Sequence, residues 1–152
     1  MSDVAYLVLR VLFSIVFLNA AWQCGKSKEG VKWTIEESRI LFGKWAPIFG
    51  VGGIGVMAVG GLSVLLGIYP EIGASMLTVF LLLGSVIHFR RQKDSVRIGE
   101  ELSSNGQDVG ELTTLASLGH YSSAMKNYSL CGPSAFIAMT GGGAYVISSL
   151  WS

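Results

Sequence analysis

The chain has 152 residues, of which 51% are hydrophobic and only 14% are charged, and its mean hydropathy is +0.54. This hydropathy exceeds what the core of a soluble domain of this length requires, so the composition indicates an integral membrane protein in a lipid bilayer. The formal net charge is +1 and the basic residues are interleaved with acidic ones, which argues against a nucleic-acid partner.

Apolar runs of membrane-spanning length occur four times along the chain. A transmembrane helix needs about 20 predominantly apolar residues, and the qualifying runs cover residues 4–22, 46–69, 72–89 and 130–151. The first run contains Arg10, and the other three contain no Lys, Arg, Asp or Glu. The predicted fold class is therefore all-α, with residues 1–152 forming a single four-transmembrane-helix bundle.

Arg10 is the only charged residue within a predicted span. An ionised group at membrane depth is rare, and it is usually paired or functional. Because helical side chains lean toward the helix N-terminus, Arg10 can reach the membrane surface, where Glu71 is a candidate ion-pair partner. Two interpretations remain open: a structural role, by snorkelling or through an Arg10–Glu71 pair, and a contact with a substrate or a quinone oxygen.

The first long connection, residues 23–45, contains a candidate surface helix. Thr34 and Glu37 have the spacing of a capping box, and Trp45 is suited to the membrane interface. We therefore expect a short amphipathic helix that begins near Thr34.

Between the second and third spans only Pro70 and Glu71 remain, and these two residues are expected to form a tight helical hairpin turn.

Small residues recur on two of the predicted spans. Helices in a bilayer associate through close backbone approach, which small residues permit. The second span has glycines seven residues apart, and the fourth has small residues at intervals of four; the predicted packing positions are Gly53, Gly60, Gly67, Ser134, Ala138 and Gly142.

The stretch LLGSVIHFRRQKDSVR (residues 82–97) changes from apolar to cationic at His88. Ten of the eleven Lys and Arg residues lie in the connections 23–45 and 90–129. By the positive-inside rule, these connections face the cytoplasm, matrix or stroma, and both termini lie on the opposite side of a bacterial plasma, inner mitochondrial or thylakoid membrane. His88 is either a headgroup-layer residue or a ligand for a head group, a quinone or a tetrapyrrole metal, with Arg90 and Arg91 as further head-group candidates.

The second long connection has a loop signal over residues 100–111, followed by a short amphipathic helix from about Glu111 to Lys126. His120 is expected on the surface of that helix and is a further ligand candidate.

Cys24 and Cys131 both lie at positive-side ends of spans, but isolated thiols are weak evidence for redox chemistry. The spacing of His and Cys resembles no metal-ligand pattern, so no metal site is predicted.

Residues 9–26, 60–77, 125–136 and His88 resemble the DoxX-like membrane proteins, including the plant lesion-inducing-like branch. The resemblance implies a four-helix membrane protein, and some members of the family resemble small subunits of quinone-linked oxidoreductases such as thiosulfate:quinone oxidoreductase. Members often carry an acidic residue shortly before a Gly-Gly pair of the second span. Met57 stands at that position here, so an activity that uses the acid is in doubt.

No predicted span contains a carboxylate, and no nucleophile–base pair is visible. This favours a small accessory subunit that packs laterally against other subunits of a larger respiratory or photosynthetic complex. The alternative is a membrane subunit of a quinone-linked oxidoreductase of the thiosulfate:quinone type. The candidate bound molecules are a lipid, a quinone or a pigment.

Overall fold

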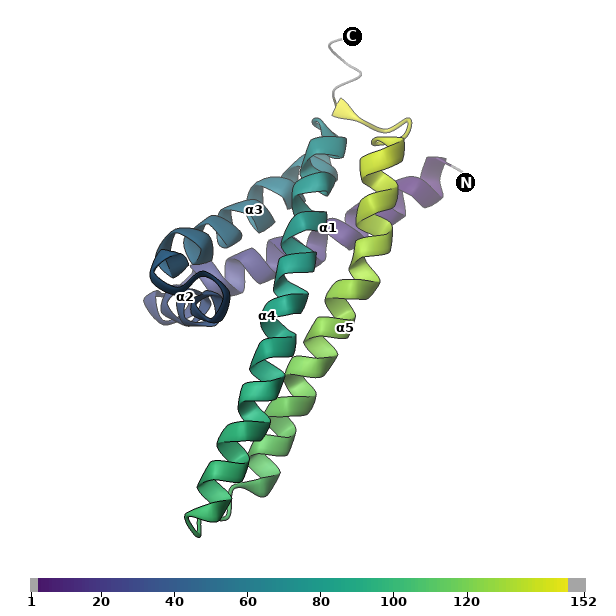
Figure 1. Ribbon diagram of the computed structural model, residues 1–152. Helices are drawn as coiled ribbons and strands as arrows, with labels where there is room; N and C mark the ends of the chain where they lie inside the picture. The colour runs from purple at the N-terminus through teal and green to yellow at the C-terminus, as the bar shows by residue number, and fades with distance from the viewer. Residues whose placement is uncertain (1–2, 148–152) are drawn as a thin grey trace.

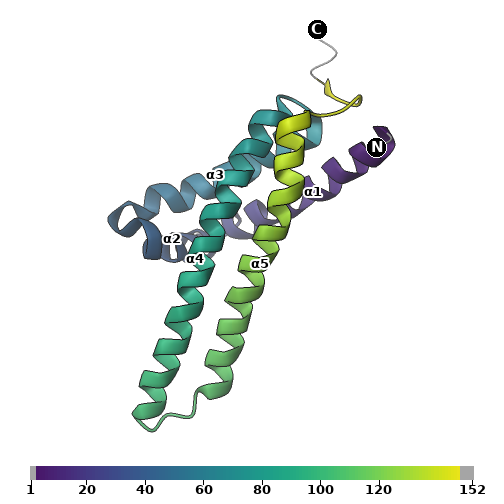
Figure 2. The same ribbon diagram turned by 45° about the vertical axis from the view of Figure 1, so that its right-hand side comes forward.

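The computed structural model of the chain describes residues 3–147, which are helical over most of their length. In chain order the elements are α1 (Asp3–Gly25), α2 (Lys28–Phe42), the 3₁₀ turn η1 (Gly43–Trp45), α3 (Ala46–Leu66), α4 (Pro70–Ser104) and α5 (Gly110–Thr140). The all-α prediction is therefore confirmed. α4 and α5 form a long antiparallel hairpin, and α1 and α3 run obliquely across one half of it (Figures 1 and 2).

Three stretches of the described chain are long and apolar enough to cross a membrane: Asp3–Gly25, Lys28–Leu66 and Pro70–Ser104. The prediction of a membrane protein is confirmed at this level. The predicted fourth span, 130–151, is wrong because α5 ends at Thr140. The apolar part of α5, from Leu130 onward, is only about 16 Å long, roughly half of the hydrocarbon thickness. Residues 148–151 of the predicted span lie outside the described residues.

α4 and α5 are longer than the sequence pattern predicts, with 35 and 31 residues. The expected loop over residues 100–111 is reduced to 105–109, and the expected short helix 111–126 continues directly into the apolar part of α5. Two causes account for this difference. Residues 127–129 contain neither glycine nor proline, and α4 and α5 pack closely even in their polar halves, where the Thr113 side chain lies against Gly99.

α2 begins earlier than predicted. Ser27 is its N-cap, and the Ser27 side chain accepts a 3.0 Å hydrogen bond from the Gly30 amide. The capping box predicted at Thr34 is wrong, since Thr34 lies inside the helix and its hydroxyl donates to the Gly30 carbonyl at 2.9 Å. A serine directly before the helical run satisfies the free amides of the first turn, so the helix needs no cap further along the chain.

The turn between α3 and α4 also lies earlier than predicted. Gly67 caps α3 in the left-handed conformation, with φ 69°, and Tyr69 has φ 48°. Pro70 is the first residue of α4, and Glu71 follows it in the first helical turn. A proline has a fixed φ and no amide hydrogen, which suits the first position of a helix better than the turn itself. The hairpin turn therefore covers residues 67–69.

The core lies where α1 and α3 cross the α4–α5 hairpin. α1 buries one face, formed by Tyr6, Arg10, Phe13, Phe17 and Ala21, at spacings of three or four residues. That face packs with buried residues of the other helices, including Met57, Val64, Leu77, Leu81 and Ile137. The opposite face of α1 exposes Val4, Val8, Leu12 and Ile15, as expected for a helix surrounded by lipid.

Candidate functional site

Arg10 is almost completely buried, with 1% of its surface exposed. Its guanidinium donates to the carbonyls of Val64 and Leu65, both at 2.9 Å, and to the carbonyl of Gly142 at 2.7 Å. Val64 and Leu65 belong to the last turn of α3, where carbonyls have no partner within the helix. Arg10 therefore caps α3 from a neighbouring helix. Among the described residues, it forms no ion pair with Glu71.

The segment that follows α5 is attached to α1 by the same side chain. Arg10 also donates to the carbonyl of Tyr145, and the Tyr6 hydroxyl donates to the carbonyl of Gly141. Gly142 lies in this segment, beyond the end of α5, so it is not part of the small-residue ladder that the sequence predicted. α1, the end of α3 and residues 141–145 thus share one buried hydrogen-bond network.

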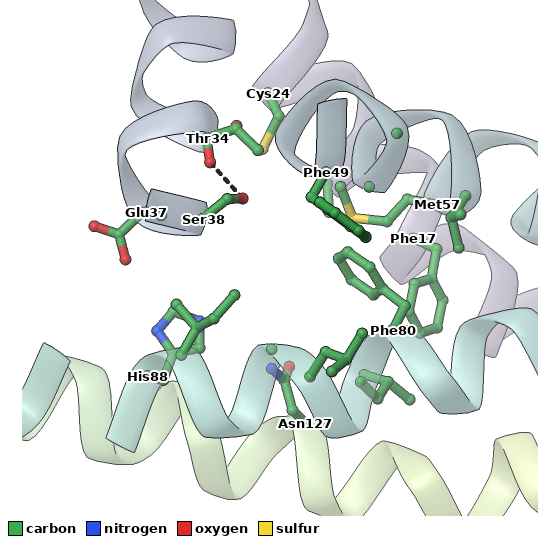
Figure 3. A pocket seen from close by; sticks show the side chains of 18 of the residues that line it. Phe17, Cys24, Thr34, Glu37, Ser38, Phe49, Met57, Phe80, His88 and Asn127 are labelled. Carbon is green, nitrogen blue, oxygen red and sulfur yellow. Dashed lines mark hydrogen bonds between the residues drawn. The ribbon is translucent and has the colours of Figure 1, made fainter. Parts of the chain in front are cut away.

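A cavity of about 650 Å³ lies between α1, α2, α3, α4 and α5. Its volume falls within the range of small-molecule sites, about 300–1,000 Å³. One part of its wall is aromatic and apolar, with Phe17, Phe49, Met57 and Phe80 (Figure 3). The arrangement of an apolar wall with few polar groups is typical of a site for an amphipathic ligand.

The polar groups of the cavity are concentrated toward its other end. Glu37 and Ser38 extend from α2, His88 extends toward them from α4, and Asn127 comes from α5 (Figure 3). Lys126 also lines the cavity. Carboxylate, hydroxyl, imidazole and amide groups supply both donors and acceptors of hydrogen bonds. This end of the cavity can therefore hold a polar head group.

His88 and His120 lie next to each other, although 32 residues separate them in the sequence. Their Nδ1 atoms are 3.3 Å apart, and both side chains are half-buried. A carboxylate oxygen of Glu37 completes a group in which the three ligand atoms lie within 4.8 Å of one another. His120 is half-buried and not fully on the surface, because the continuous α5 helix holds this residue against α4.

Arg90 and Arg91 attach α2 to α4. Arg90 donates to the carbonyl of Ile40 at 3.2 Å, and Arg91 donates to the carbonyl of Glu36. Arg91 also forms an ion pair with Glu37, with 3.3 Å between Nε and Oε1. These contacts use both guanidinium groups to hold α2 in place above the cavity.

The predicted packing residues and the two cysteines lie at several different contacts between helices. Gly53 faces Phe80, and Gly60 lies against Gly73 and Leu77 on α4. Gly67 has the left-handed conformation that ends α3. The buried Ser134 hydroxyl donates to the Ala74 carbonyl at 2.9 Å, and Ala138 packs against the core. Cys24 and Cys131 are free thiols, both partly buried against the core, and Cys24 lines the cavity.

Comparison of the chain with protein-family models, with curated proteins and with solved structures finds no match. The class of protein that the fold defines is a helical protein with three candidate membrane-spanning helices.

The sequence did not predict the cavity or the His88–His120–Glu37 group. The helical spacing of residues 113–137 does indicate the contact, because one continuous helix over that range places His120 on the side that faces α4. The predicted break between two helices at residues 127–129 leaves the orientation of His120 relative to α4 undetermined.

Proposed function

We propose that this membrane protein binds an amphipathic, lipid-like molecule in the cavity between its helices. The observation that carries the proposal is the cavity itself, whose wall is apolar around Phe17 and Phe80 and polar around Glu37 and His88. A bound molecule would place its chain along the aromatic wall and its head at the polar end. Isoprenoid quinones and membrane lipids share this chemistry, namely a long apolar chain and a small head with hydrogen-bonding oxygens.

The polar end lies beside the cationic segment that starts at Arg90, which supports a head group located at the membrane surface. Lys126 supplies a positive charge at the same end. A phosphate head or a quinone oxygen would be attracted by this charge. Phe17 and Met57 are buried, so the apolar part of the cavity wall lies toward the core, which supports binding of an apolar chain there.

A glycine in the cavity wall offers a direct test. Gly52 lines the cavity, and a Cβ at Gly52 would meet no atom of the described residues within 4 Å. We expect Gly52→Trp to reduce the amount of co-purified lipid or quinone at least tenfold, because an indole at this position occupies cavity volume without a clash in the helix. Mass spectrometry of the organic extract measures the effect and separates a quinone from a lipid.

Gly55→Trp is the matched control for this experiment. Gly55 lies on the same helix, its Cβ would also meet open space, and it does not line the cavity. The control should retain the ligand in the wild-type amount. Equal ligand content in the wild type and both variants would place any bound molecule outside the cavity and would contradict the proposal.

A second candidate function is that of an accessory subunit, and the polar half of the α4–α5 hairpin favours it. α5 exposes Leu112, Leu115 and Leu118, with 58–70% of their surface accessible. The paired part of α4, from Arg90 to Ser104, is rich in charged residues, so this region lies outside the hydrocarbon layer. A leucine stripe outside the membrane is suited to contact with another subunit.

We expect Leu115→Glu to release the protein from any assembly that it forms in its native membrane, because a charge in an apolar contact is left without a partner. The measurement is the migration of the protein in native gels after extraction with mild detergent. Gln107→Glu is the control, since Gln107 is exposed in the α4–α5 loop and is not part of α5 or its leucine stripe. If the wild type migrates alone, the accessory-subunit function is excluded.

A further inference from the structure

We propose that Glu37, His88 and His120 form a binding site for one divalent transition-metal ion. The three residues come from α2, α4 and α5, and one ligand atom from each lies within 4.8 Å of the others. The site goes beyond the proposed function, because it depends on these three side chains and not on a lipid in the cavity.

The distance between the two imidazoles matches that of two ligands of one metal ion. Zn–N bonds are about 2.0–2.1 Å long and the coordination is tetrahedral, so two nitrogen ligands of one zinc ion lie about 3.3–3.4 Å apart. The Nδ1 atoms of His88 and His120 are 3.3 Å apart. Only one hydrogen can lie between these two Nδ1 atoms. At least one of the two nitrogens therefore carries no hydrogen and has a lone pair that a metal ion could use.

Glu37 supplies the third ligand. Its Oε1 atom pairs with Arg91, while its Oε2 atom is buried and has no hydrogen-bond partner among the residues that the structure describes. A buried carboxylate oxygen without a partner is unfavourable, and a metal ion would satisfy it. Arg91 would then hold the carboxylate from behind, as outer-shell groups do in metal sites.

Two histidines and a carboxylate bind zinc and other first-row metals through nitrogen and oxygen. Such a set leaves one coordination position for a water molecule or another ligand, as in sites that act on a bound molecule. Arg91 and Lys126 add positive charge nearby, so the structure favours an anion or an oxygen-bearing head group at that position. Glu37 and His88 also line the cavity, which places the metal at its polar end.

The test is a titration of the purified full-length protein, without a polyhistidine tag, with Zn²⁺ against a chromophoric chelator and with Co²⁺ by visible absorption. We expect one equivalent of metal per chain and the intense bands of four-coordinate Co²⁺. His88→Ala, His120→Ala and Glu37→Gln should each weaken Zn²⁺ binding at least about tenfold, because each removes one ligand.

Glu36→Gln is the matched control. Glu36 is the neighbouring residue, but its side chain is half exposed and pairs with Arg39. This variant should bind Zn²⁺ as the wild type does. Glu37→Gln preserves size and shape, so a loss of binding confined to Glu37→Gln is a loss of the ligand and not of the fold.

Three outcomes would overturn the proposal: no stoichiometric metal in the wild type, equal binding by the wild type and the His88→Ala and His120→Ala variants, or equal weakening in Glu36→Gln and Glu37→Gln. The first outcome would identify the two imidazoles as a hydrogen-bonded pair only. The Gly52→Trp variant separates this test from that of the proposed function, since it should lose the lipid-like ligand and retain the metal.

Discussion

Replacement of Arg10 by leucine is expected to destabilise the protein by at least about 3 kcal/mol, because hydrogen bonds from a charged group contribute about 1.5–3 kcal/mol each. Arg10 donates to four backbone carbonyls, at the end of α3 and in the segment after α5. Leucine fits an apolar helix but provides no donor, so these carbonyls would stay unsatisfied where little water reaches them. The melting temperature in detergent should fall by about 10 °C.

Two further arginine substitutions, Arg97→Leu and Arg10→Lys, are the controls for the loss of stability in Arg10→Leu. Arg97→Leu removes an arginine whose side chain is 70% exposed and forms an exposed ion pair with the nearby Asp94, so it should leave the melting temperature almost unchanged. Arg10→Lys retains the charge but has fewer and less widely spread donors, so it should give an intermediate value. An equal effect of Arg10→Leu and Arg97→Leu would exclude the capping role of Arg10.

The part of the fold that depends on apolar length was predictable from the sequence. α1 and α3 agree with the predicted spans to within a few residues, because hydrocarbon runs of that length are stable only as helices at membrane depth. The part that depends on helix pairing was not. The polar residues 90–104 read as a connection by composition, and they are helical because α5 packs against them.

The candidate site was also predictable only in part from the sequence. Arg10 was identifiable as a buried or paired charge from its position in an apolar run, but its partners were not. They are backbone carbonyls, which every residue has, so no side-chain pattern marks Val64, Leu65 or Gly142 as acceptors. The His88–His120 contact depends on the register of two antiparallel helices, and a loop boundary misplaced by a few residues is enough to hide it.

The second large loss of stability is expected from a substitution at Gly60, where α3 crosses α4. A Cβ atom at Gly60 would lie 2.9 Å from Leu77 Cγ and 3.1 Å from the Gly73 carbonyl oxygen. Leu77 is fully buried and the Gly73 oxygen belongs to the backbone, so neither can move without a shift of α4. We expect Gly60→Leu to cost about 3 kcal/mol, since overpacking of a tight contact forces the helices apart.

The same chain provides a control within one helix. Gly55 is exposed on α3, and a Cβ there would meet no atom within 4 Å in the described part of the chain. Gly55→Leu adds the same side chain to the lipid-facing surface, where leucine is as apolar as its surroundings, so the melting temperature should not fall. If Gly60→Leu and Gly55→Leu melt at the same temperature, α3 and α4 do not approach each other through Gly60. A lower melting temperature for Gly60→Leu alone would instead identify this glycine as the contact that allows α3 to cross α4 closely.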